Sequence, residues 1–206
     1  MPSYIDLSHS VTDGMVVYQG DPSVKLVQQS TFSRDGFSDF HFSSGMHSGT
    51  HLDGPMHLTS SPIRIAGLPL ECFSGPGFLV NVHGQIVIDL PEMALDTLVP
   101  NSIVLFYSGF DQHWGKDLYF DHHPVLSEQT ARMLVKKQVR MVGIDFPSPD
   151  YAPYNTHKIL LDNQILILEN LTNLVALLPY REFELLAFPL KMEADSAPVR
   201  VVARVE

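Results

Sequence analysis

Six short runs of apolar, often β-branched residues constrain the fold of this chain more than any other feature. They occupy residues 4–8, 78–82, 103–107, 141–144, 164–168 and 199–205. A run that is apolar throughout, such as 103–107, predicts a strand covered on both faces, whereas the mixed run at 199–205 predicts a strand with one face exposed. The sequence therefore predicts a sheet-rich fold.

Two segments have the pattern of helices. In residues 127–137, apolar side chains recur on one face, and Ser127 is the expected N-cap. In residues 89–95, Asp89 is the expected N-cap, and Pro91 falls near the first turn, where proline is tolerated. The first of these helices leads directly into an apolar run, which is the order of elements in α/β proteins.

The chain of 206 residues has no internal repeat and no linker-like stretch, so we expect one domain over residues 1–206. We predict a mixed α/β class with more strand than helix. Cys72 is the only cysteine, which excludes an internal disulfide and indicates a reducing compartment. The first residues lack the features of a secretory signal, and we therefore expect a cytoplasmic protein.

The formal net charge of −10 argues against partners that require clustered Lys and Arg. Nucleic acid and anionic membrane surfaces are therefore not expected to bind. The sequence also has no apolar run of about 18 residues, so no membrane span is expected.

The segment that carries chemistry is His47-Ser-Gly-Thr-His51-Leu-Asp53-Gly-Pro-Met-His57. Its glycines and proline disfavour a helix, so the segment is expected to be extended. Side chains of an extended segment alternate with a period of two, and the four numbered residues are all odd, so they can project to one side. Two imidazoles and a carboxylate suit Zn²⁺, Mn²⁺ or Fe²⁺ and leave a coordination position for water. The alternative is a surface loop whose histidines bind no metal.

A second group of polar residues lies late in the chain. Glu169 ends an apolar run, and His157 precedes that run by seven residues. Either Glu169 faces a cavity or it marks the point where a strand reaches solvent. The pattern by itself does not join His157 and Glu169 to the first segment.

The first segment resembles the His-x-Gly-Thr-His-x-Asp-x-Pro-x-His motif of the cyclase-type metal-dependent hydrolases, a family that contains bacterial kynurenine formamidase and isatin hydrolase. The likeness continues over nearly the whole chain, in residues 5–10, 18–22, 109–127 and 143–171. It implies the family's swivelling β/β/α fold. It also implies a small-molecule substrate and a homodimer or a homotetramer built from dimers.

The resemblance also implies roles for individual residues. A divalent metal, Zn²⁺ or Mn²⁺, with one or two ions per subunit, would bind His47, His51, Asp53, His157 and Glu169, with Asp53 bridging. His57 corresponds to the proton donor and acceptor. Tyr18 falls where formamidases carry a tryptophan that contacts the aryl substrate.

The implied activity is hydrolysis of an aryl formamide such as N-formylkynurenine, which yields kynurenine and formate in tryptophan catabolism. One alternative is an isatin-type lactam hydrolase or a lactone hydrolase. A third hypothesis is a metal-binding module that has lost turnover. Asp145 and Asp150 either shape the pocket or cap a loop, and Trp114 lies near either the site or an interface.

Overall fold

The computed structural model describes residues 2–206 and contains a nine-stranded sheet. Four of the predicted apolar runs lie in its central strands, at residues 78–82, 103–107, 141–144 and 164–168, whereas the runs at 4–8 and 199–205 lie in strands at one side of the sheet. Its four central strands are parallel, and antiparallel strands flank them on both sides. In spatial order the strands are β1 (Ser3–Asp6), β13 (Val202–Val205), β11 (Phe183–Leu186), β5 (Ser74–Asn81), β7 (Ile103–Tyr107), β9 (Met141–Ile144), β10 (Leu166–Glu169), β4 (His51–Asp53) and β12 (Ser196–Pro198).

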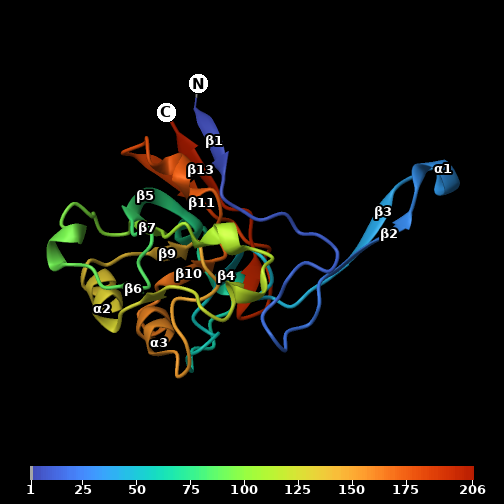
Figure 1. Ribbon diagram of the computed structural model, residues 1–206. Helices are drawn as coiled ribbons and strands as arrows, with labels where there is room; N and C mark the ends of the chain where they lie inside the picture. The colour runs from blue at the N-terminus through green and yellow to red at the C-terminus, as the bar shows by residue number, and fades with distance from the viewer. Residues whose placement is uncertain (1) are drawn as a thin grey trace.

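Both faces of the central strands are covered, as the continuous apolar runs predict. On one face, Val104 and Phe106 of β7 pack with residues of the helices α2 (Glu128–Lys136) and α3 (Asn155–Asp162), which Figure 1 shows side by side. On the other face, Leu105 packs in a cluster that includes Ala203 of β13 and Ala197 of β12. Because opposite ends of the sheet contribute to one cluster, the sheet is strongly curled.

The two predicted helices have different outcomes. The helix over residues 127–137 is confirmed as α2, and the Ser127 hydroxyl caps it by accepting a hydrogen bond from the Thr130 N–H at 3.0 Å. The helix over residues 89–95 is wrong, because only one 3₁₀ turn, Glu92–Leu95, forms there. Asp89 does not cap it, since its carboxylate instead accepts a hydrogen bond from Ser127 Oγ at 2.6 Å.

Two other boundaries differ from the sequence-based expectation. The run at 164–168 begins as a strand only at Leu166, because Gln164 has a φ of 60° where the chain leaves α3. The run at 199–205 is strand only from Val202, and its residues alternate between buried and less buried, as expected for a half-exposed strand. Helix α3, which carries His157, was not predicted.

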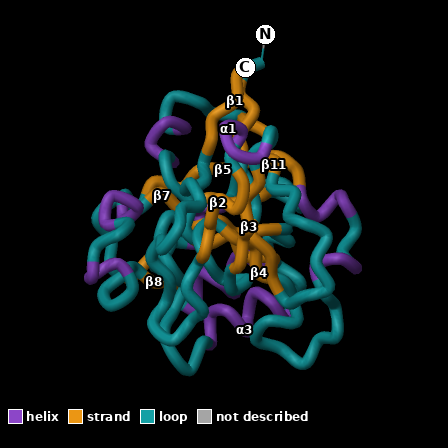
Figure 2. The backbone as a smooth tube through the Cα atoms, turned by 90° about the vertical axis from the view of Figure 1, so that its right-hand side faces the viewer, coloured by secondary structure: helices purple, strands orange, loops and turns teal. Residues whose placement is uncertain are grey.

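Residues 25–43 form an arm that projects from the body (Figure 1) and points toward the viewer in Figure 2. The arm consists of β2 (Lys25–Ser30), α1 (Phe32–Asp35) and β3 (Asp39–Ser43), and its two strands pair only with each other. Every residue of β3 is exposed. The remaining strands, β6 (Val87–Ile88) and β8 (Val125–Leu126), form a short parallel pair. Within residues 2–206, no helix has the length and apolar character needed to span a membrane.

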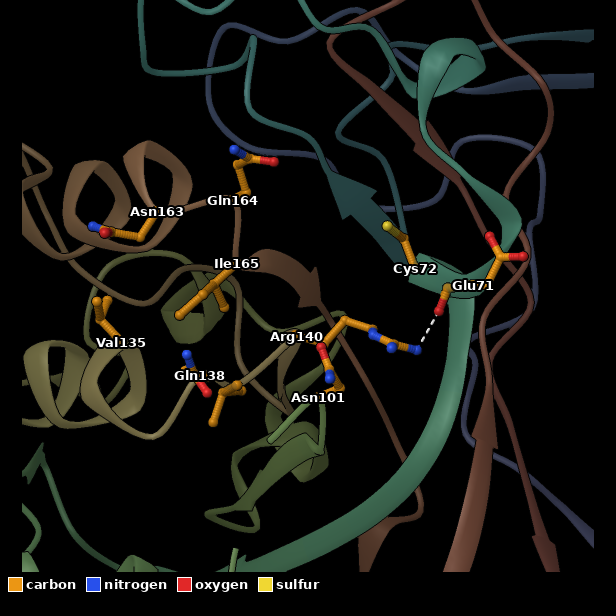
Figure 3. Close-up of a pocket in the computed structure, with 10 residues that line it drawn as sticks. Glu71, Cys72, Asn101, Val135, Gln138, Arg140, Asn163, Gln164 and Ile165 are labelled. Atoms are coloured by element: carbon orange, nitrogen blue, oxygen red, sulfur yellow. Dashed lines mark hydrogen bonds between the residues drawn. The ribbon is translucent and has the colours of Figure 1, made fainter. Parts of the chain in front are cut away.

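A cavity of about 380 Å³ lies where β9 and β10 begin (Figure 3). Arg140 lines it and donates hydrogen bonds to the carbonyls of Glu71 and Ser74, so its guanidinium braces a loop against β5. The other lining residues are mainly amides and aliphatic side chains, with no histidine and no aspartate among them. Glu71 and Cys72 are the only His, Cys, Asp or Glu side chains among the lining residues, and neither belongs to a group of three or more within the described part of the chain that could hold a metal ion.

Candidate metal centre and active site

The pairing of β4 with β10 brings the two predicted half-sites together. These strands are antiparallel neighbours, and His51 lies directly opposite Glu169 in the register. His51 and Asp53 are two residues apart on β4, so both side chains point to the same side of the strand, while Leu52 points into the core. Residues separated by more than a hundred positions in the sequence therefore meet at one point.

His47 and His57 reach the site through turns, and the expectation that all four residues share one extended segment is wrong for these two. Only His51–Asp53 is a strand. Gly49 has a φ of +66°, and a Cβ there would lie 2.9 Å from Met15 Cε, so the chain turns tightly between His47 and β4. His57 follows a second turn, in which its N–H donates to the Gly54 carbonyl at 3.1 Å.

Three imidazoles each direct one nitrogen inward and the other to an outer acceptor. Nδ1 of His51 lies 2.8 Å from the Gly49 carbonyl, and Nδ1 of His157 lies 2.5 Å from the Asp150 carboxylate. Nε2 of His47 lies 2.9 Å from Asp195. Since carbonyls and carboxylates only accept hydrogen bonds, these outer nitrogens carry the protons. The inner nitrogens therefore present lone pairs whenever the rings are neutral.

The inner nitrogens converge on two carboxylates. Nδ1 of His47 lies 3.0 Å from Asp53 Oδ1, and Nε2 of His51 lies 3.4 Å from the same oxygen and 3.3 Å from Glu169 Oε2. Nε2 of His157 lies 3.3 Å from Glu169 Oε1. Despite these short separations, His51 Nε2, both Asp53 oxygens and Glu169 Oε1 are buried without an aligned hydrogen-bond partner. Buried acceptors that face one another need a shared cation or extra protons, so these residues fit a divalent metal.

The electrostatics agree with that fit. Burial lowers the pKa of the His47 imidazole, but Asp53 outweighs burial, and the pKa is raised to about 9. Burial likewise lowers the pKa of His157, but the neighbouring carboxylates of Asp150, which accepts a hydrogen bond from Nδ1, and of Glu169 outweigh burial and raise the pKa to about 10. Burial raises the pKa of Asp53, but His47 and His51 lower it well below its usual range. Without a cation, the carboxylates therefore hold protons on the histidines.

The ligand atoms form two groups that share Asp53. His51, Asp53 and Glu169 make one group, and His47, Asp53 and His57 make the other, with the atoms of each group within 4.8 Å of one another. Asp53 is therefore the one residue common to both groups, and the bridging role that the family resemblance implies for it stays a prediction. A ring nitrogen of His57 lies close enough to Asp53 and His47 for His57 to bind the same cation, so this grouping does not by itself separate a ligand from a proton carrier.

Asp195 completes the site and was not predicted from the sequence. Its Oδ2 lies 2.9 Å from His47 Nε2 and 3.2 Å from His57 Nδ1. Burial raises the pKa of Asp195, but its hydrogen bond with His47 outweighs burial, and the pKa is lowered. A lone aspartate far from both motifs has no local signal, and only the pairing of β12 with β4 brings it to the histidines.

A cavity of about 220 Å³ opens beside these residues, with a rim rich in aromatic side chains. Tyr18, the predicted substrate contact, lines it and packs edge-on against Phe120 at 5.8 Å between ring centroids. The other polar and aromatic lining residues include Asp21, His123, Ser148, Asp150, Tyr151 and Tyr154. No lysine or arginine occurs among the lining residues.

Asp145, Asp150 and Trp114 lie in three different surroundings. Asp145 does not line the cavity and accepts hydrogen bonds from the N–H groups of Ser108 and Gly109, so it stabilises the loop after β7. Asp150 lines the cavity and holds His157. Trp114 stacks on His9 at 4.1 Å and does not line the cavity.

Comparisons with known proteins identify the family. Residues 5–151 match the family model described as "Putative cyclase". A kynurenine formamidase from Bordetella avium is 33% identical over 165 residues, which cover 77% of this chain and 76% of that protein.

Solved structures have the same fold. The structure of a predicted metal-dependent hydrolase from Bacillus stearothermophilus is 26% identical, with a TM-score of 0.82 and coverage of 99% of this chain and 98% of that chain. Isatin hydrolase A from Labrenzia aggregata is 22% identical and superposes with a TM-score of 0.87, covering 99% of this chain and 94% of that chain. The mixed, sheet-rich fold predicted from the sequence pattern is confirmed. The chain belongs to the cyclase family of metal-dependent hydrolases.

Proposed function

We propose that this protein hydrolyses an amide bond of an aryl substrate, with an aryl formamide as the leading candidate. The observation that carries the proposal is the convergence of three imidazole nitrogens on Asp53 and Glu169 beside an aromatic cavity. We assign His47, His51, Asp53, His157 and Glu169 as the residues that hold the cation, either Zn²⁺ or Mn²⁺. When bound, the cation would supply polarisation of a carbonyl and a lowered pKa of water.

The residues around the metal ligands supply the remaining chemistry. His57 lies at the cavity and accepts a proton from the attacking water, then returns a proton to the departing amine. Tyr18 and Phe120 provide aromatic surface for an aryl group. Asp150 orients His157 by accepting its Nδ1 proton.

A second candidate is hydrolysis of an uncharged ring amide, as in an isatin-type lactam, or of a lactone. The side chains that line the cavity include Asp21 and Asp150 but no lysine or arginine. The α-carboxylate of N-formylkynurenine would therefore meet no lysine or arginine of this protomer, whereas an uncharged lactam needs none.

The test is a substrate panel with the metal-loaded protein. N-formylkynurenine, an aryl formamide without a carboxylate, isatin and simple lactones are each assayed with Zn²⁺ or Mn²⁺. Turnover of either formamide at least ten times that of the other compounds supports the leading candidate. Preference for isatin supports the second candidate. No turnover of any compound would overturn both and favour a metal-binding module without activity.

We also propose that the protein is a homodimer joined through the arm, residues 25–43. Four phenylalanines of the arm are between 44% and 76% exposed: Phe32, Phe37, Phe40 and Phe42. At about 200 Å² per aromatic side chain, each arm exposes roughly 450 Å² of phenylalanine surface. Two arms that each cover a similar area on the other copy would bury roughly 1,800 Å², which is the size of a stable interface.

Charge favours a second copy of this chain as the partner that covers the arm. The arm contains two basic and two acidic residues and is formally neutral, whereas the whole chain carries −10. The body of one copy repels the body of another, but the arm does not. An isolated two-stranded hairpin is also only marginally stable, so contact with a partner would stabilise it. A homotetramer could form from such dimers, and a measured mass distinguishes the two.

A further inference from the structure

The backbone of Asp195 is held rigidly against the metal-binding strand. Ser196, the first residue of β12, pairs with Asp53 of β4, and the Asp195 carbonyl accepts a hydrogen bond from the Gly54 N–H at 2.9 Å. A Cβ at Gly54 would lie 2.9 Å from that carbonyl oxygen, so this approach requires glycine. The preceding Ala194 carbonyl accepts from the Ile65 N–H at 3.0 Å. Asp195 therefore enters the site from a fixed backbone.

One oxygen of Asp195 contacts two histidines, of which His47 is assigned as a metal ligand and His57 as the proton carrier. Oδ2 lies 2.9 Å from Nε2 of His47 and 3.2 Å from Nδ1 of His57. An ionised carboxylate has no proton to give, so both of these nitrogens are the protonated ones, and the Ser196 hydroxyl oxygen, 3.0 Å from His47 Nε2, then accepts from the same N–H. The opposite nitrogen of His47, Nδ1, then faces Asp53 as a lone pair. Nε2 of His57 has no hydrogen-bond partner among residues 2–206.

We propose that Asp195 is a positioning residue that sets the tautomers of His47 and His57 together. By accepting an N–H from each ring, it leaves His47 Nδ1 free to bind the cation and His57 Nε2 free to carry a proton. One carboxylate thus couples the orientation of a metal ligand to that of the proton carrier. The inference rests on the proposed function for its catalytic consequence, but the tautomer assignment itself does not.

The first test measures the tautomers directly. In ¹⁵N-histidine-labelled protein loaded with Zn²⁺, the His57 signals are expected to show a protonated Nδ1 and an unprotonated Nε2. The Asp195→Ala variant removes the acceptor, and its His57 should become a mixture of tautomers or change to Nε2–H. A wild-type His57 protonated at Nε2, or an unchanged tautomer in Asp195→Ala, would overturn the proposal. The wild-type measurement decides even if the variant does not fold.

The second test separates hydrogen-bond acceptance from loss of charge. Asp195→Ala should lower kcat by about 10- to 100-fold, the usual effect of removing such an outer partner, with KM little changed. Asp195→Asn retains an acceptor oxygen and should recover most of that loss. Glu193→Gln is the matched control, because it removes one negative charge two residues away, where the side chain is 76% exposed and contacts Arg64. Equal losses in Asp195→Ala and Asp195→Asn would overturn positioning by hydrogen bonding.

Metal content distinguishes failure of this inference from failure of the proposed function. If wild-type protein hydrolyses no substrate but its His57 shows the expected tautomer, the proposed function fails and the positioning role stands. If wild-type protein is active and Asp195→Ala has wild-type kcat, metal content and tautomer, the positioning role fails and the function stands. Elemental analysis accompanies each variant, since a weaker His47 ligand should lower the zinc affinity by a similar factor, measured by competition with a chelator.

Discussion

His51 of β4 and Glu169 of β10 are direct partners in an antiparallel register, and His51 Nε2 lies 3.3 Å from Glu169 Oε2. This pairing joins the two halves of the site into one cluster with few aligned hydrogen bonds on its inner side. Strand register is strongly specified wherever a face of a strand is buried, and β10 is buried throughout. The apolar core therefore determines the positions of the charged groups.

The first prediction concerns the contribution of His51 to metal binding. His51→Ala should remove a fully buried ligand candidate. The negative charges of Asp53 and Glu169 would then repel each other with one fewer imidazole between them. We expect the purified variant to retain little divalent metal and to lose nearly all hydrolysis. Elemental analysis and activity are the measurements. Undiminished hydrolysis by wild-type protein that contains no transition metal would contradict the assignment.

Much of this fold could be predicted from the sequence, because strands such as β7 and β9 have continuous apolar runs that only a two-sided sheet can bury. The helix predicted over residues 89–95 does not form because Asp89 accepts a hydrogen bond from the Ser127 hydroxyl, a contact between distant segments that a local sequence pattern cannot show. Helix α3 was missed because Tyr154, at its N-cap position, has a left-handed backbone and no side-chain capping bond.

The candidate site was predictable only in part. The motif around His51 has a local signal, and His157 and Glu169 were added by family resemblance. Asp195 has neither, because its position depends on β12 pairing with β4 across more than a hundred residues of sequence. Carboxylates that orient histidines from another strand are visible only once the sheet is assembled.

His57→Ala is the second prediction. The variant should keep its metal, because five other ligand candidates remain, and should lose activity by about 100- to 10,000-fold, the usual contribution of a general acid–base group. Activity and elemental analysis are measured together. His122→Ala is the control, since His122 is exposed and does not line the cavity. If His57→Ala loses its metal, then His57 is a ligand, as its distance to Asp53 also allows.

The third prediction concerns pH. The pKa of His47 is raised to about 9 and that of His157 to about 10 in the absence of a cation, so binding near neutral pH must displace protons. Apparent affinity should therefore rise with pH, by about tenfold per unit for each proton displaced, until those pKa values are passed. Competition with a chelator between pH 6 and 9 measures this effect. An affinity that is independent of pH would contradict it.

The same shifts determine the stability of the metal-free protein. Histidines with raised folded-state pKa values stabilise the fold fully below the unfolded value of 6.5, and this contribution is lost as pH rises through about 9 and 10. The thermal unfolding temperature of chelator-treated protein should therefore fall from pH 7 to pH 10. Metal-loaded protein should not show this loss, because the cation replaces the protons. Equal slopes for the two forms would exclude this explanation.

The fourth prediction tests the arm as a dimer contact. Changing Phe32 and Phe37 together to serine should remove much of the apolar surface that a second copy covers. We expect light scattering coupled to gel filtration to report a dimer for wild-type protein and a monomer for the double variant. Leu70→Ser is the control, because Leu70 is also 68% exposed but lies outside the arm. A monomeric wild-type protein would refute the proposal.

The last prediction concerns the close packing of the central sheet. Gly143 of β9 has Leu105 on β7 and Leu171 beside it, and a Cβ at this position would lie 2.5 Å and 2.7 Å from their methyl groups. Gly143→Ala should therefore destabilise the protein by about 1–3 kcal/mol, the usual cost of overpacking a core. Gly67→Ala is the matched control, since nothing lies within 4 Å of a Cβ there. Denaturant unfolding measures both, and a Gly143→Ala variant as stable as wild type would mean that the sheet relaxes at β9.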